Sequence, residues 1–277
     1  MSKLYLVGTP IGNLGDFSSR AVETLRTVDF IAAEDTRVTL KLLNRFEISK
    51  PMVSYYQHNL RERGEQIVAR ILSGESCALV TDAGMPAISD PGEDLVRLCA
   101  EAGIEIVSVP GPSAATTALA MSGLNTSRFT FEGFISTNRQ NRREHLESLA
   151  IERRTMIFYE APHKLRTTLN DLAATFGQER RIALCRELTK LHEEVIRTTL
   201  GLAVARYAAP DSTAPRGEFV LVVEGAPEIT TPAATLEQAV ALAQALMAGG
   251  QGASAAAKQA AQQIGCKKSD IYRQLTQ

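Results

Sequence analysis

The chain has 277 residues, of which 44% are hydrophobic and 22% carry a charged side chain. This balance is typical of a folded globular protein and excludes a mainly disordered, fibrous or disulfide-framework chain. The formal net charge of −1 excludes the global positive field that draws proteins to nucleic acid or anionic membranes, so any contact with a polyanion must be local.

Targeting segments and metal motifs are not evident in the sequence. The apolar run at the start is too short for a signal peptide, and no run is long enough to cross a membrane. We therefore expect a cytoplasmic protein without a membrane partner. The four Cys and four His residues show no metal-ligand spacing, so no metal is expected.

The first half of the chain alternates short aliphatic runs with amphipathic stretches of helical length. This alternation is typical of an α/β protein with a mostly parallel, doubly wound sheet. The predicted strands are residues 4–8, 30–33, 52–55, 78–81 and 106–109. The predicted helices are residues 18–27, 36–44, 62–72, 94–102 and 113–124.

Beyond residue 124 the predicted strands lie closer together, at residues 129–134, 155–159, 182–185 and 219–224. With fewer helices between them, they predict a second domain with a mixed sheet. We therefore expect a first domain over residues 1–125, a second over 126–226, a linker rich in Pro and Thr at 227–234, and a tail of three short helices at 235–277. The tail is interpreted as a small capping bundle rather than a helix-turn-helix, because a recognition helix there would carry few basic residues.

Loops that follow predicted strands are the candidates for a site, because open α/β sheets bind ligands outside the carboxyl ends of their strands. The first loop, residues 8–16, reads Gly-Thr-Pro-Ile-Gly-Asn-Leu-Gly-Asp. It has neither the G-x-G-x-x-G spacing of dinucleotide binders nor the Walker spacing with its Lys, so an NTPase or a dinucleotide dehydrogenase is disfavoured. Its glycines indicate a backbone that lies close to a ligand or to a neighbouring helix.

Two further loops have unusual composition. Residues 82–92 read Asp-Ala-Gly-Met-Pro-Ala-Ile-Ser-Asp-Pro-Gly, which is more than a bare turn requires and indicates a loop whose shape is partly set before a ligand binds. Residues 110–114, Pro-Gly-Pro-Ser-Ala, place an N-cap Ser before a helix whose free amides suit a carboxylate or phosphate.

Acidic residues also follow two other predicted strands. Glu34 and Asp35 stand beside Arg37, an arrangement that suits a general base or an anchor for a hydroxyl group. The alternative is structural, with Asp35 or Thr36 capping the next helix and Arg37 in solvent. Farther on, Phe158-Tyr-Glu-Ala-Pro-His163 places aromatic and charged side chains at the end of a strand.

Taken together, these segments resemble the tetrapyrrole methylase superfamily, whose members bind S-adenosylmethionine in a cleft between two α/β domains. The order of the motifs, including Cys185-Arg-Glu-Leu-Thr-Lys190, is similar to the branch that methylates the 2′-hydroxyl of one cytidine in small-subunit ribosomal RNA. The resemblance covers about residues 4–225. Met85 departs from it, because a Thr is usual there.

The resemblance implies which residues hold the cofactor. The second and third loops would contact its methionine part, and the second domain would hold its adenine; the implied residues are Asp82, Gly84, Ile88, Asp90, Ser113, Ala114, Tyr159, Glu160, Leu188, Glu218 and Phe219. The first loop is implied to face the substrate.

Methyl transfer to a ribose hydroxyl requires alignment and a group that takes the proton. Asp35 is the predicted base, with Glu34 and His58 in reserve. Asn13 is predicted to orient the hydroxyl, and Arg37 to hold a neighbouring phosphate.

The expected macromolecular partner is small-subunit ribosomal RNA or the assembled small subunit. The local RNA-contact candidates are Arg142 and Arg143, on a charged helical stretch that also includes Arg139, Arg153 and Arg154. A homodimer is expected because dimers are common in the superfamily.

Two alternatives stay open at this point. One is a methylase that acts on a tetrapyrrole or another small molecule in the same cleft. The other is a non-catalytic module that binds a nucleotide or RNA.

Overall fold

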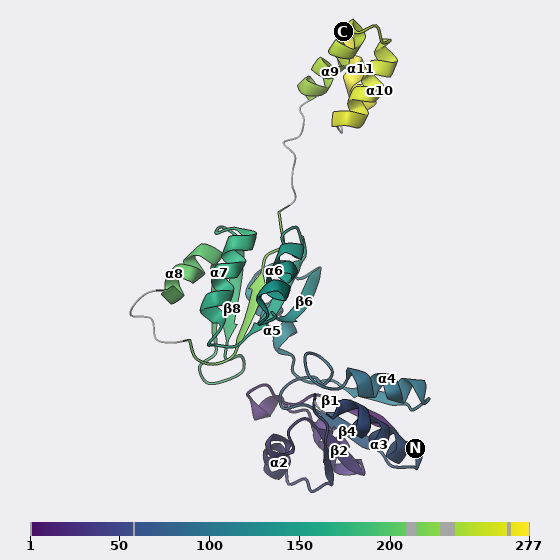
Figure 1. Ribbon diagram of the computed structural model, residues 1–277, viewed down its shortest axis with the longest axis vertical. Coiled ribbons are helices and arrows are strands. Elements are labelled where there is room, and N and C mark those ends of the chain that lie inside the picture. Colours follow the sequence, from purple (N-terminus) through teal and green to yellow (C-terminus); the bar gives the residue numbers. More distant parts are fainter. Residues whose placement is uncertain (1, 58, 209–214, 228–235, 265–266, 277) are drawn as a thin grey trace. The chain divides into compact units, whose positions relative to one another are not determined.

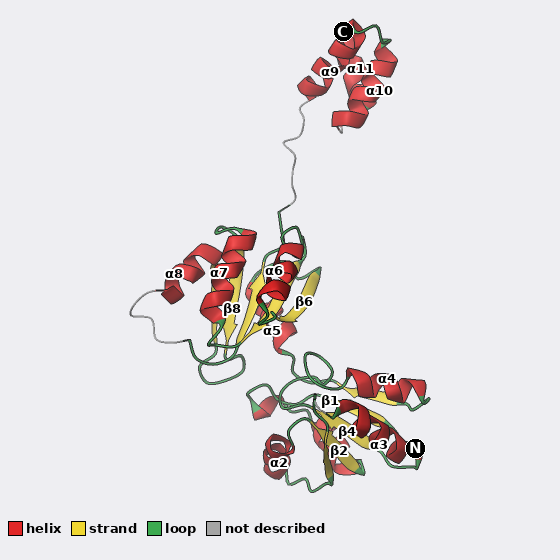
Figure 2. Ribbon diagram, in the orientation of Figure 1, coloured by secondary structure: helices red, strands yellow, loops and turns green. Residues whose placement is uncertain are grey.

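The computed structural model describes residues 2–57, 59–208, 215–227, 236–264 and 267–276. The chain divides into two compact units, residues 1–226 and 227–277. The first unit contains two five-stranded sheets, shown in yellow in Figure 2, and Figure 1 labels several of their strands. The predicted fold class, an α/β protein with a parallel first sheet, a mixed second sheet and a helical tail, is confirmed.

The first sheet consists of parallel strands in the order β3-β2-β4-β1-β5. Every residue of β2 and β4 is buried, as expected for central strands covered on both faces. Strand order reverses beside β1 and β4, which makes the loops after these strands the expected place for a ligand. The strands are β1 (Leu4–Val7), β2 (Phe30–Ala33), β3 (Met52–Ser54), β4 (Cys77–Val80) and β5 (Ile106–Val109).

Helices cover both faces of this sheet. Alternate residues of β2 enter two separate cores, one shared with α1 and α2 and the other shared with α3 and α4. A short 3₁₀ helix, Leu14–Asp16, lies within the first loop. The α-helices are α1 (Ser19–Thr27), α2 (Thr36–Arg45), α3 (Leu60–Leu72) and α4 (Glu93–Glu101).

The second sheet is mixed and has the order β6-β7-β10-β8-β9. Strands β6 and β7 are parallel, whereas β10 pairs antiparallel with β7 and β8, and β8 pairs antiparallel with β9. The strands are β6 (Phe129–Phe134), β7 (Thr155–Glu160), β8 (Arg181–Arg186), β9 (Glu194–Thr199) and β10 (Phe219–Val223).

Helices also cover both faces of the second sheet. One face packs against α5 (Ala114–Ser122). The other packs against α6 (Arg139–Ser148), α7 (Leu165–Phe176) and α8 (Leu200–Ala208). The predicted domain boundary near residues 124–128 stays a prediction, but α5, which precedes it, belongs to the core of the second sheet.

Each predicted strand and helix of the first unit that was given bounds has a counterpart in the structure, with ends shifted by up to two residues. The charged stretch is helical only over Arg139–Ser148, so the prediction that Arg153 and Arg154 lie on it is wrong. Strand β9 and helices α7 and α8 were not predicted. Strand β9 lies at the edge of its sheet and has no fully buried residue, so its sequence shows little hydrophobic alternation.

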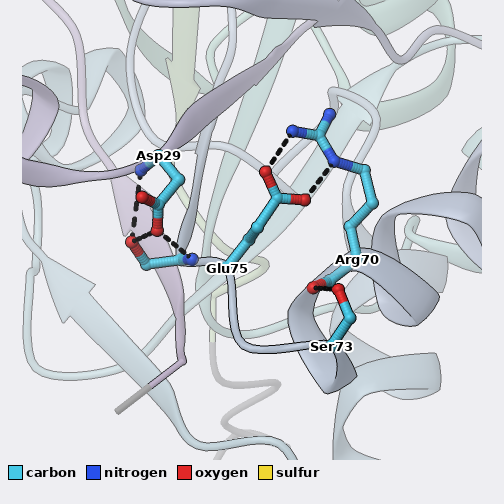
Figure 3. A network of polar contacts seen from close by, with 5 residues as sticks. Asp29, Arg70, Ser73 and Glu75 are labelled. Carbon is cyan, nitrogen blue, oxygen red and sulfur yellow. Dashed lines mark hydrogen bonds and ion pairs between the residues drawn. The ribbon is translucent and has the colours of Figure 1, made fainter.

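The amino ends of β2 and β4 are joined by side-chain contacts (Figure 3). Arg70 donates two hydrogen bonds to Glu75, at 2.6 and 2.7 Å, and its guanidinium lies 3.5 Å from the centre of the Phe30 ring. Asp29 accepts hydrogen bonds from the backbone N–H and the hydroxyl of Ser76, at 2.6 and 2.7 Å. These contacts fix one end of the central strands and leave the opposite end for the loops described below.

The second unit consists of the three predicted helices, α9 (Leu236–Ala248), α10 (Ala253–Ile264) and α11 (Lys268–Leu275). Its core is built mainly from alanines of α9 and α10, with Ile271 of α11. Gly249 and Gly250 separate α9 from α10 as predicted. The predicted stop at Gly265 and almost all of the predicted linker lie outside the described residues.

Candidate active site

A cavity of about 380 Å³ lies in the first unit, at the carboxyl ends of strands from both sheets. This volume is within the range of small-molecule sites. The residues implied to hold the cofactor meet there, although they come from distant parts of the chain. Those that line the cavity are Gly84, Ile88, Asp90, Ser113, Ala114, Tyr159, Glu160, Leu188, Glu218 and Phe219.

Asp82 is the implied cofactor residue that does not line the cavity. Its carboxylate instead accepts a hydrogen bond from the backbone N–H of Asp35, at 3.2 Å. Several lining residues were not predicted, because they are apolar or small and carry no chemical signal in the sequence. They are Ile11, Ala83, Met85, Ser89, Phe134, Ala161, Pro162, Cys185 and Val220.

The first and second loops are joined by backbone hydrogen bonds. The N–H of Thr9 donates to the carbonyl of Gly84 at 2.9 Å, and the N–H of Gly84 donates back at 3.1 Å. The Thr9 hydroxyl donates to the carbonyl of Thr81 at 3.1 Å. The loop after β1 is thereby fixed against the loop after β4, where strand order reverses.

The first and third loops are in direct backbone contact. A Cβ atom placed on Gly8 would lie 2.7 Å from the Cα of Gly111, and one on Gly111 would lie 2.9 Å from the Cα of Gly8. The N–H of Gly111 donates to the sulfur of Met85 at 3.3 Å. The glycines of both loops are therefore required for close packing, and the Met85 side chain contributes to it.

The second sheet contributes aromatic side chains to the wall of the cavity. The Tyr159 hydroxyl accepts a hydrogen bond from the N–H of Ala115 at 3.2 Å, which uses one of the free amides at the start of α5. Its ring makes edge contacts with Phe131 and Phe134, with ring centres 5.0 and 5.5 Å apart. Ser113 lies at the predicted N-cap position, but its side chain makes no capping hydrogen bond.

Lys190 connects three loops beside the cavity. Its ammonium group is 2.9 Å from Glu187 and 2.8 Å from Glu218. A Cβ on Gly12 would lie 2.5 Å from the Cγ of Lys190, so the first loop packs directly on the lysine side chain. In the sequence, Lys190 stood out only as the last residue of a family motif. Predicting its contacts would have required knowledge of the fold.

Four acidic residues follow the central strands β2 and β4. Glu34 accepts a hydrogen bond from the Thr81 hydroxyl at 2.6 Å. Burial raises the pKa of Asp90 to about 6, and the charges of Glu34 and Asp82 add to this effect. Burial and the charges of Glu34 and Asp35 also raise the pKa of Asp82. Carboxyl groups with raised pKa values in a cavity are candidates for proton transfer.

Asp35 has a different environment. Its carboxylate is the N-cap of α2 and accepts from the backbone N–H of Arg37 at 2.8 Å. It also accepts two hydrogen bonds from the Arg37 guanidinium, at 3.0 and 2.7 Å, which lower its pKa to about 2. The structural alternative for this segment, in which Asp35 caps the next helix, is therefore present in the molecule.

The predicted catalytic residues Glu34, Asp35, Asn13 and Arg37 do not line the cavity. Asn13 accepts a hydrogen bond from the N–H of Gly15 at 2.9 Å and caps the short 3₁₀ helix. Their catalytic roles stay predictions. His58, the reserve base, lies outside the described residues.

The predicted RNA contacts lie beside a second hollow, between α6 and α7, which is lined by Arg139, Arg142, Arg143 and Asp171 among others. Arg142 is largely buried and donates to Asp171 at 2.6 Å and to the Thr168 hydroxyl at 2.9 Å. Arg143 is exposed and lies 3.8 Å from Glu147. Of the two predicted residues, Arg143 is thus the one whose charge faces solvent.

Two features bear on other kinds of partner. Within the described residues, no group of three or more His, Cys, Asp or Glu side chains is placed to hold a metal ion. No described helix has both the length and the apolar character that crossing a membrane requires.

The fold and the cavity define a methylase of the tetrapyrrole methylase class. A family model described as "Tetrapyrrole (Corrin/Porphyrin) Methylases" matches residues 3–203. Among solved structures, diphthine synthase aligns with a TM-score of 0.59 over 80% of this chain and 90% of that chain, and at 16% identity this similarity shows the fold alone.

Relatives with similar sequences identify one family within the tetrapyrrole methylases. Ribosomal RNA small subunit methyltransferase I of Synechocystis sp. is 49% identical over 273 residues, which cover 99% of this chain and 97% of the relative. The protein of the same name from Thermotoga maritima is 46% identical over 225 residues, which cover 81% of this chain and 99% of that relative. The chain belongs to the ribosomal RNA small subunit methyltransferase I family within the tetrapyrrole methylases, and the predicted family is confirmed.

Proposed function

We propose that this protein transfers the methyl group of S-adenosylmethionine to the 2′-hydroxyl of a cytidine in small-subunit ribosomal RNA. The observation that carries the proposal is one cavity lined by residues of both sheets, in a chain of this family. The resemblance in the sequence implied ten of these lining residues from their motifs alone.

The residues of the cavity fit S-adenosylmethionine chemically. The start of α5 at Ser113 and Ala114 suits the carboxylate of the methionine part. Leu188, Phe219 and Val220 provide apolar surface for an adenine ring. Asp90 provides a negative charge for the sulfonium side. When bound, S-adenosylmethionine supplies an activated methyl group on a sulfonium whose departure leaves a neutral thioether.

The protein's own contribution is alignment and exclusion of water. The hydrogen bonds between Thr9 and Gly84 hold the first loop beside the cavity, and Lys190 holds it against the second domain. We propose that the first loop faces the ribose. Asn13 is an exposed residue of this loop and is suited to orient a hydroxyl group.

The residues after β2 are proposed to serve the RNA side of the site. Asp35 fixes the Arg37 side chain, which is 87% exposed and therefore available to an RNA phosphate. Glu34 accepts a hydrogen bond from the Thr81 hydroxyl and Asp82 accepts one from the Asp35 N–H, so these two carboxylates connect the segment after β2 to the segment after β4.

Methyl transfer with labelled cofactor tests the proposal. Small ribosomal subunits and naked small-subunit RNA from cells that lack this protein's gene would be compared with porphyrinoid substrates. We expect label in RNA, in digests as 2′-O-methylcytidine. Label only in a porphyrinoid would favour a small-molecule methylase, and RNA binding without any label would favour a non-catalytic module.

Arg143 is proposed to neutralise an RNA phosphate. We expect Arg143→Ala to reduce the slope of log affinity against log salt by about 0.7 to 0.9, the contribution of one phosphate contact. Arg61→Ala is the matched control, because Arg61 is also exposed and pairs with an acidic residue one turn away, at 3.6 Å. Equal slopes for the two variants would contradict the role of Arg143.

The same measurement of salt dependence tests Arg142→Ala. For Arg142, a phosphate contact requires release from Asp171.

Homodimerisation and a cytoplasmic location complete the proposal. Light scattering during size-exclusion chromatography measures the first, and cell fractionation the second.

A further inference from the structure

We propose that Asp90 accepts the proton of the ribose 2′-hydroxyl during methyl transfer. This inference rests on the proposed function and assigns its general base to the loop after β4, whereas the sequence placed the base after β2, at Asp35.

The carboxylates that line the cavity differ in how they are held. They are Asp90, Glu160 and Glu218. Glu160 is 3% exposed and accepts hydrogen bonds from the Thr168 hydroxyl and from the N–H of Ala161. Glu218 forms an ion pair with Lys190 at 2.8 Å. Asp90 lines the cavity and forms no ion pair with any described residue; a hydrogen bond with the Thr81 side chain partly lowers its pKa, and a substrate hydroxyl can approach it without breaking an ion pair.

Asp35 and Glu34 are less suited to accept a proton. Both oxygens of Asp35 are engaged by Arg37, and a carboxylate with a pKa of about 2 is a weak base. Glu34 accepts the hydrogen bond of the Thr81 hydroxyl, and neither residue lines the cavity.

The surroundings of Asp90 favour a stronger base. The charged groups that face it are Glu34, after β2, and Asp82, after β4; the Thr81 hydroxyl is the polar group that offsets part of their repulsion. From the second sheet, Tyr159 lines the same cavity, and burial together with the Asp90 charge raises the pKa of its hydroxyl. With a pKa of about 6, Asp90 is mostly ionised at neutral pH and is a better proton acceptor than an ordinary Asp.

The step balances without another reactant. The 2′-oxygen forms a bond to the methyl carbon while the carbon–sulfur bond breaks, and the electron pair of that bond stays on sulfur. The hydroxyl proton moves to an Asp90 oxygen and later to solvent. The products are the methylated ribose, a neutral thioether and one released proton.

Single-turnover methyl transfer at saturating cofactor tests the role of Asp90 directly. We expect Asp90→Asn to slow transfer to the small subunit by about 100-fold to 10,000-fold, the usual contribution of a general base. Asp94→Asn is the matched control on the next helix, because Asp94 pairs with Arg97 and does not line the cavity. Asp90→Glu, which keeps the carboxylate, should recover part of the rate, and Asp35→Asn should lose less than Asp90→Asn.

The pH dependence separates a base from a structural residue. The wild-type rate should fall about tenfold for each pH unit below the pKa of Asp90. In the complex this pKa should be about 6 or somewhat lower, because the bound sulfonium favours the ionised form. The residual rate of Asp90→Asn should lack this dependence, whereas Asp94→Asn should keep it.

Proton release on cofactor binding provides a measurement without turnover. Calorimetry of wild type at pH 6 in buffers of different ionisation enthalpy should show release of up to about half a proton, because the cation lowers the pKa of a half-protonated Asp90. Asp90→Asn should bind the cofactor and release fewer protons than wild type does.

The outcomes distinguish this proposal from the proposed function. A wild type that transfers no methyl group to the subunit overturns the proposed function and this inference with it. Beside an active wild type, the inference alone is overturned if Asp90→Asn stays within about tenfold of the wild-type rate, if its deficit disappears at saturating cofactor, or if proton release is unchanged in the variant.

Discussion

The loops after β2 and β4 leave neighbouring strands of one sheet, and each carries acidic side chains. The surroundings of these carboxylates are opposite in charge in the two loops. In the β2 loop, Asp35 is neutralised by Arg37 and caps a helix. In the β4 loop, Asp90 lies on the cavity among like charges. The comparison shows that the partner of a carboxylate, rather than its position after a strand, decides whether it stabilises the fold or is available for chemistry.

The β4 loop depends on its glycines, and Gly92→Ala should therefore have the largest effect on stability. Gly92 has φ +148°, and a Cβ there would lie 2.9 Å from Leu79 and 3.0 Å from the backbone N of Ala87. We expect the free energy of unfolding to fall by about 3 kcal/mol in urea denaturation. Gly103→Ala, at a positive φ in open space, should cost about 1 kcal/mol; equal losses would contradict the role of close packing.

Asp90→Asn should stabilise the protein while it impairs methyl transfer. Because the folded-state pKa of Asp90 is raised from 3.8 to about 6, ionisation favours unfolding increasingly between these pH values, and the penalty persists above pH 6. Partial exposure reduces the penalty, and we expect a gain of about 1 kcal/mol at pH 8. Denaturation at pH 3 should show no such gain, and a gain of the same size there would exclude an electrostatic cause.

Asp35→Asn should have the smallest effect, and of the opposite sign. Asn still caps a helix, so the main loss is the ion pair with Arg37. Because the folded-state pKa of Asp35 is lowered to about 2, its stabilisation is present above pH 4 and is lost as the pH falls toward 2. We expect the melting temperature of the variant to be slightly lower at pH 7 and to converge with that of wild type near pH 2. If Asp35→Asn were more stable than wild type at pH 7, the proposed difference between the carboxylates of the two loops would be contradicted.

Much of the fold and of the cavity could be predicted from the sequence. Buried aliphatic runs such as Phe30–Ala33 identify strands directly, and the rule that ligands bind at carboxyl ends directs attention to the right loops. Family motifs then implied residues as distant as Ile88 and Phe219, which line one cavity in the structure.

Other features could not be predicted because they depend on contacts between distant residues. The sequence placed Glu34, Asp35 and Arg37 together, but it did not show that the guanidinium would engage Asp35 rather than Glu34. The burial that raises the pKa of Asp90 requires knowledge of both sheets. Arg142 illustrates the same limit, because its partner Asp171 lies on α7, a helix that was not predicted.

The contact between Gly8 and Gly111 restricts how this protein could be redesigned. Each backbone occupies the volume that a methyl group on the other would need, so exchanging either residue alone would displace β1 from β5. Engineering that seeks to accept donors with larger alkyl groups should therefore begin with Ile88, whose side chain lines the cavity and can be shortened without moving a strand.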